Sequence, residues 1–159
     1  MSVRVGDRNQ SRIEFLYQAD KLYESIFCLT SRYFGIYSKN SPIRSKYSQY
    51  VKHRSKEDIH NFIEKQSILL EDMSGDLCRL LASANSIYPK SKIEYDIRLE
   101  YITKALACLN SIKATLNLVV KFFDLDINVF KDTVLLLDKE INLVKKLRRS
   151  DRKRFGQLL

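Results

Sequence analysis

Arg54 and His60 are the two side chains whose types and spacing come nearest to a catalytic pair. Five residues separate them, and His53 is the only other histidine in the chain. A histidine can hold or move a proton near neutral pH, and an arginine can stabilise the charge that develops on a phosphate. Cleavage of a phosphodiester is therefore one interpretation of this pair. The same spacing arises by chance about as often as not in a chain this rich in arginine.

Other catalytic constellations do not occur in the sequence. The four glycines are spread along the chain, so they cannot form a glycine-rich phosphate loop, and the two histidines match no metal-binding motif. Cys28, Cys78 and Cys108 lie far apart among apolar neighbours, which predicts small core residues instead of a disulfide framework or a metal site. We therefore expect no cofactor, no metal and no enzymatic activity.

The positive charge of the chain is confined to two segments. The 159 residues carry a net charge of +9. Residues 32–56 contain seven Lys and Arg and no acidic residue, and residues 145–154 contain seven against Asp151 alone. The remainder holds 14 basic and 18 acidic residues, which makes it slightly acidic. Charge segregated in this way favours a surface that binds a polyanion.

We name residues 145–154 the basic tail and residues 35–54 the basic connector. The cations that we expect to contact nucleic acid or a partner protein are Lys145, Lys146, Arg148, Arg149, Arg152, Lys153 and Arg154 in or beside the tail, and Arg44, Lys46, Lys52, Arg54 and Lys56 in or beside the connector. Three aromatic residues are candidates for stacking on bases, namely Tyr47, Tyr50 and Phe155.

The elements that must position these residues are helices. Apolar residues recur at spacings of three and four, the period of an amphipathic helix. The predicted helices span residues 11–34, 55–87, 91–123 and 126–154. Two short connections and one long one join them, which predicts an all-α, antiparallel up-down-up-down four-helix bundle with long helices. Helices of this length also favour self-association.

The helix boundaries are predicted from capping residues. Ser11 with Glu14, and Ser91 with Glu94, have the spacing of a capping box. Asp126 is the expected cap of the last helix, and Pro89 ends the second. We expect a single domain over residues 11–155, a flexible N-terminus over residues 1–10 and a short C-terminal tail over residues 156–159.

No apolar run approaches the 18 residues of a membrane span, and the first residues lack the apolar stretch of a signal peptide. These features predict a cytoplasmic protein without a membrane partner.

Two families are similar to parts of this sequence. Arg54 and His60 resemble the Arg-x(4–6)-His signature of the HEPN ribonucleases, all-α proteins that use such a pair in a dimer. More of the chain, strongly residues 98–155 and loosely residues 12–34, resembles the Avd-like four-helix-bundle family. Avd is the accessory variability determinant of diversity-generating retroelements, and the family is related to proteins of rRNA intervening sequences. The most specific match is Ser150-Asp151-Arg152-Lys153-Arg154-Phe155.

The Avd-like resemblance implies a non-catalytic, basic accessory protein that assembles into a homo-pentamer. Such a protein binds nucleic acid, RNA or DNA, together with a reverse transcriptase, and supports cDNA synthesis from a template RNA. The chain departs from the family in its connector, residues 35–54 with Pro42, which is longer than the usual turn. A protein-binding adaptor that does not bind nucleic acid is the alternative, and a HEPN-like ribonuclease is a further one.

Overall fold

The structure is a computed structural model in which the described residues are 5–34, 55–122 and 127–158. Every regular element in these ranges is helical, and no strand occurs in them. The elements in chain order are α1 (Val5–Leu29), a π-helical turn (Thr30–Phe34), α3 (Lys56–Ser86), α4 (Lys92–Phe122), a 3-10 turn (Ile127–Phe130), α5 (Lys131–Phe155) and a last 3-10 turn (Gly156–Leu158). The prediction of an all-α fold is confirmed.

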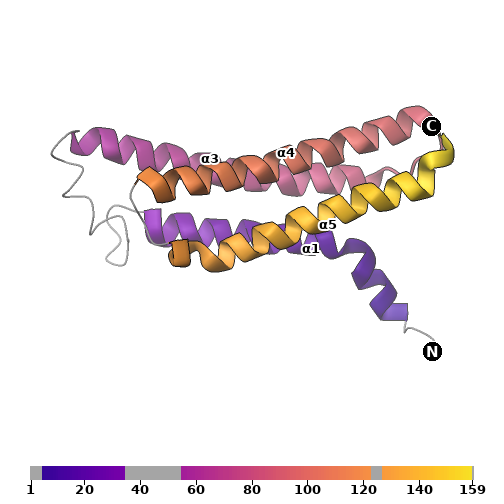
Figure 1. Ribbon diagram of the computed structural model, residues 1–159, viewed down its shortest axis with the longest axis horizontal. Coiled ribbons are helices and arrows are strands. Elements are labelled where there is room, and N and C mark those ends of the chain that lie inside the picture. Colours follow the sequence, from indigo (N-terminus) through magenta and orange to yellow (C-terminus); the bar gives the residue numbers. More distant parts are fainter. Residues whose placement is uncertain (1–4, 35–54, 123–126, 159) are drawn as a thin grey trace.

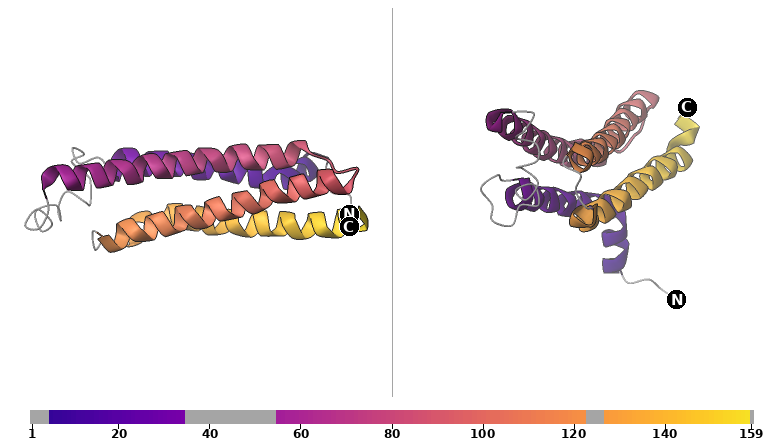
Figure 2. Two further views of the ribbon diagram at one scale, coloured as in Figure 1. Left: turned by 90° about the horizontal axis from the view of Figure 1, so that it is seen from above. Right: turned by 60° about the vertical axis from the view of Figure 1, so that its left-hand side comes forward.

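Four long helices pack against one another along their lengths (Figures 1 and 2). α1 contacts α3 and α5, and α4 contacts the same two helices. Apolar side chains from all four fill the space between them, because each helix carries its apolar residues on one side. Fully buried examples are Leu22, Ile26, Leu77, Leu81, Ile102, Leu109, Leu137 and Val144.

The helix ends follow the predicted caps in part. Ser55 caps α3, since its hydroxyl accepts from the Asp58 amide at 3.0 Å while the Asp58 carboxylate accepts from Ser55 in return. At the start of α4 the Ser91 hydroxyl accepts from the Glu94 amide at 3.3 Å, but the Glu94 carboxylate accepts from the amide of Lys90 instead of Ser91. Asp126, the predicted cap of the last helix, lies outside the described residues.

The prediction was wrong about where the first helix begins. α1 starts at Val5, so Ser11 lies inside the helix and residues 5–10 belong to α1. The first turns of α1 point away from the other three helices (Figures 1 and 2). A segment that leaves the packed helices has no need of an apolar stripe, which is why periodicity did not detect it.

α4 is the described helix that comes nearest to the composition of a membrane span. Of the described helices, it alone has a window of 18 residues that is long and apolar enough to cross a membrane, with a mean hydropathy of 1.2. A core helix of a soluble protein passes the same test, and α4 supplies buried residues such as Ile102 and Leu109 to the core. The window is therefore weak evidence for a membrane span.

A carboxyl group lies unpaired in the core. Glu140 of α5 is fully buried, and neither of its oxygens has a hydrogen-bond partner. The Nε2 atom of Gln18, on the neighbouring α1, is also buried without a partner. Burial raises the pKa of Glu140 from 4.5 to about 8, while the charge of Lys139 lowers it and that of Glu14 raises it. The folded protein therefore holds this carboxyl protonated at neutral pH.

We expect Glu140→Gln to stabilise the fold, increasingly so as the pH rises. The folded-state pKa lies above the unfolded one, so the folded state binds the extra proton, and stability is lost as the pH rises from about 4.5 to about 8. The amide has the same shape and never ionises. The variant should match the parent near pH 4.5 and exceed it by about 2–4 kcal/mol at pH 8 in urea unfolding. Glu64→Gln, at an exposed glutamate of α3, is the control. A difference in unfolding free energy between Glu140→Gln and the parent that stays constant with pH would contradict the raised pKa of Glu140.

Candidate nucleic-acid interface

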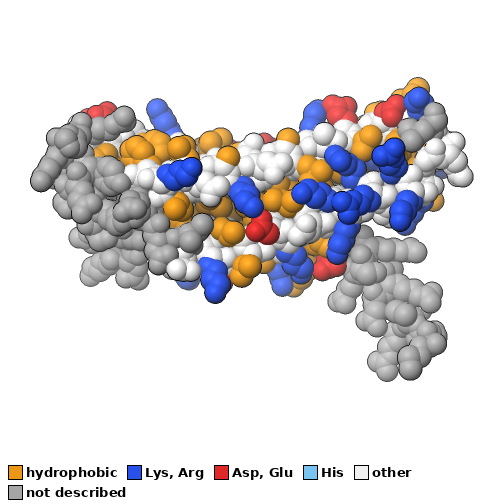
Figure 3. All heavy atoms as spheres, in the orientation of Figure 1, with side chains coloured by type: hydrophobic (Ala, Val, Ile, Leu, Met, Phe, Trp, Pro, Cys, Tyr) orange, Lys and Arg blue, Asp and Glu red, His pale blue; other side chains and the backbone are white. Residues whose placement is uncertain are grey.

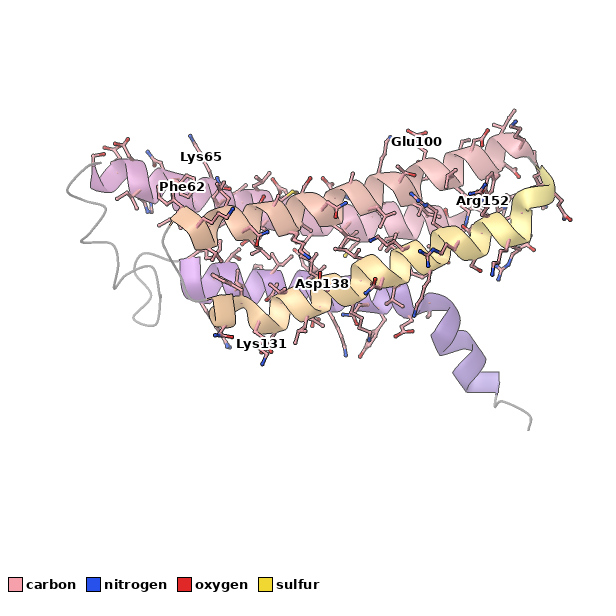
Figure 4. The ribbon with its side chains drawn as sticks, viewed as in Figure 1. Phe62, Lys65, Glu100, Lys131, Asp138 and Arg152 are labelled. Carbon is pink, nitrogen blue, oxygen red and sulfur yellow. The ribbon has the colours of Figure 1, made fainter. Side chains whose placement is uncertain are left out.

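The basic tail forms the last turns of α5, and all seven of its Lys and Arg residues are exposed. Lys and Arg are good helix formers, and at a helix C-terminus their charges complement the helix dipole. Figure 3 shows Lys and Arg side chains gathered over the part of the visible face where α5 ends. Arg152 lies at this end of the molecule, whereas Lys65 and Lys131 lie at the other (Figure 4).

The cations occupy two adjacent faces of α5. Lys145, Arg149 and Arg152 stand at intervals of four and three, so they share one face. Lys146 and Arg154 are eight residues apart and share a second face, where both line a pocket. The tail therefore presents positive charge both outward and toward this pocket.

Asp151, the one acidic residue of the tail, is only 2% exposed and forms an ion pair with Arg98 of α4. The Arg98 Nε donates to Asp151 Oδ2 at 2.5 Å and the Nη2 donates to Oδ1 at 3.3 Å, which is a two-point contact between guanidinium and carboxylate. Because Arg98 is itself only 7% exposed, both charges of the pair are almost entirely removed from solvent. The seven exposed cations therefore have no exposed acid among them within the tail.

Arg98 also joins the end of α3 to this pair. Its Nη1 donates to the carbonyl of Ala84 and, at 2.8 Å, to the carbonyl of Ile87. Carbonyls at the end of a helix lack partners within the helix, and a guanidinium can supply them. One buried side chain thus connects α3, α4 and the last turns of α5, and it fixes the part of α5 that carries the tail.

Phe155 corrects the prediction that it stacks on bases. It is 5% exposed and packs edge-on against Tyr88, with ring centroids 5.4 Å apart. Its ring also lies 6.3 Å from the ring of Tyr95, which is buried. Its ring is therefore part of the packing between helices. Tyr88, 69% exposed, is the aromatic surface here, and sequence reasoning missed it.

The connector residues lie outside the described residues, namely Arg44, Lys46, Tyr47, Tyr50, Lys52 and Arg54. Lys56 begins α3, but its side chain is likewise not described. His60 is a half-buried residue of α3. Because Arg54 lies outside the described residues, the proposed pairing of these two side chains stays untested. The start of α3 and the end of α5 lie at opposite ends of the molecule (Figure 1).

The three cysteines are free thiols. Burial raises the pKa of Cys78 and of Cys108 to about 11, so both are protonated and unreactive at neutral pH. Cys28 is exposed on α1, contrary to the prediction that it is a core residue. Within the described ranges no group of three or more His, Cys, Asp or Glu side chains is placed to hold a metal ion.

No protein-family model, curated protein or solved structure matches the chain. The Avd-like and HEPN-like resemblances therefore stay hypotheses.

Proposed function

We propose that this protein binds nucleic acid through the basic tail, without catalysing a reaction on it. The observation that carries the proposal is the exposure of all seven cations of the tail on one helix end, together with the burial of Asp151 against Arg98. Complementing the helix dipole requires fewer charges than this, and only those within the last turn. The cations beyond those that complement the dipole are suited to binding a chain of phosphates.

Binding of this kind has little sequence preference. Guanidinium groups hold phosphate oxygens by two parallel hydrogen bonds, and lysine contributes a point charge. Phosphates are the same at every nucleotide, so these contacts position the nucleic acid without reading its bases. Each neutralised phosphate releases counterions, which makes the affinity depend steeply on salt.

We propose further that the chain serves as a reverse-transcriptase accessory protein in the cytoplasm, as an antiparallel up-down-up-down bundle within a homo-pentamer. The Avd-like resemblance of residues 98–155 supports this part of the proposal. The packing of each long helix against two others is compatible with such a bundle.

Titration of a labelled RNA at 50 and at 200 mM salt tests the binding function. If six phosphates are neutralised, log K falls with log salt at a slope of about −5, which is roughly a thousandfold weakening over this range. An affinity that stays flat between the two salts would contradict nucleic-acid binding through the tail. Capture of a reverse transcriptase by a protein without RNA affinity would instead favour the adaptor function.

A further inference from the structure

A pocket with a volume of about 720 Å³ lies beside the basic tail. Residues from the middle of α1, the end of α3, the start of α4 and the end of α5 line it, so all four long helices are needed to form it. Its volume is within the range of about 300–1,000 Å³ that is usual for sites that hold small organic groups.

Two cations of the basic tail line this pocket. Lys146 and Arg154 line it from the second face of α5, with Ser150 between them at intervals of four residues. The Arg98–Asp151 pair also lines it, but each charge of the pair is balanced by the other. Glu14, the other acidic residue of the lining, pairs with Lys139 at 3.4 Å. The unpaired charge at this pocket is therefore positive.

An aromatic ring stands in the same pocket. Tyr88 lines it and is 69% exposed, and the edge-on contact with buried Phe155 holds the ring in place. Exposed Asn85 and Ser150 add amide and hydroxyl groups that can pair with the polar edge of a ligand. An aromatic platform among cations and hydrogen-bonding groups is the combination that binds an unpaired nucleotide.

We infer that this pocket receives an unpaired nucleobase, which stacks on Tyr88 while Lys146 and Arg154 hold the flanking phosphates. The inference rests on the proposed function and deepens it, because it names single-stranded nucleic acid as the preferred ligand. In a duplex the bases are already stacked and paired, so only a single strand, a loop or an end can supply one without cost.

The test compares Tyr88→Ala with the parent protein, using a single-stranded oligonucleotide and the same oligonucleotide with abasic sites. Stacking of one base on an aromatic residue corresponds to about a ten- to hundredfold gain in affinity. We expect Tyr88→Ala to weaken binding of the normal strand by that factor and to leave binding of the abasic strand unchanged. The salt slope should be the same for both proteins, since stacking releases no counterions.

Tyr88→Phe keeps the ring and should retain the parent affinity. Tyr17→Ala removes another exposed tyrosine, on α1 and outside the pocket, and should change nothing. The parent protein gives a result that does not depend on any variant folding, because it should bind the abasic strand at least tenfold more weakly than the normal one. Equal binding of the two strands would overturn the nucleobase pocket, and if the salt dependence persisted, the proposed function would still stand.

Discussion

Asp151→Ala is expected to lower the free energy of unfolding by about 3–5 kcal/mol, the usual cost of breaking a buried ion pair. The substitution leaves the Arg98 guanidinium buried without its carboxylate, which accepts from both Nε and Nη2. It also loosens the last turns of α5, because Arg98 connects them to the end of α3. Urea unfolding followed by circular dichroism measures the change.

The Arg79–Asp76 pair is a matched control, since it joins the same two residue types on an exposed helix surface. Asp76→Ala should cost far less stability than Asp151→Ala, because solvent screens an exposed pair. Replacing both partners of the buried pair, with Arg98→Met and Asp151→Leu, should recover part of the loss by removing both charges. A loss below 1 kcal/mol for Asp151→Ala would show that the pair does not hold α5 in place.

The second large effect is expected when the outward face of the tail is neutralised. Arg148 lies three residues after Lys145 and four before Arg152, so substituting Gln for Lys145, Arg148, Arg149 and Arg152 removes four phosphate contacts from this face. At 0.1 M salt the counterions that these contacts release correspond to roughly a thousandfold in affinity. All four side chains are exposed, so the fold and its stability should be preserved. Fluorescence anisotropy with labelled single-stranded RNA gives the affinity.

The control variant removes the same net charge from other parts of the molecule. Its substitutions are Lys21, Lys65, Lys121 and Lys131 to Gln, all of them exposed residues outside the tail. Two of them, Lys65 and Lys131, lie at the opposite end from Arg152 (Figure 4). We expect less than about a tenfold change here, because beyond a Debye length of about 10 Å the remaining effect of net charge is weak. If the two variants lost RNA affinity equally, the net charge of the protein and not a binding site in the tail would account for the binding.

Local rules predicted much of the fold. Spacings of three and four located all four long helices, and the last one buries Leu137, Ile141 and Val144 as its pattern predicts. The same rules cannot show a polar residue that is buried. Glu140 lies among the apolar residues of α5, and only the packing of α1 against α5 reveals that it has no partner.

The site was predicted in part. Exposure of the seven cations agrees with the charge pattern, but that pattern counts Asp151 only as one negative charge in a basic segment. Its partner Arg98 is 53 residues away, so sequence neighbours give no indication of the pair. One signal was present, since Asp151 and Phe155 follow Leu147 at intervals of four and continue the buried side of α5. Tyr88 has no such signal, because its role depends on a pocket built from four helices.

The most direct test of the account is the slope of log K against log salt for single-stranded RNA, measured for the parent protein and for the variant with the neutralised outward face. The parent should give about −5 and the variant about −2, since each lost phosphate contact removes about 0.7–0.9 from the slope. Equal slopes for the two proteins would contradict the claim that the tail of α5 is where this protein holds nucleic acid.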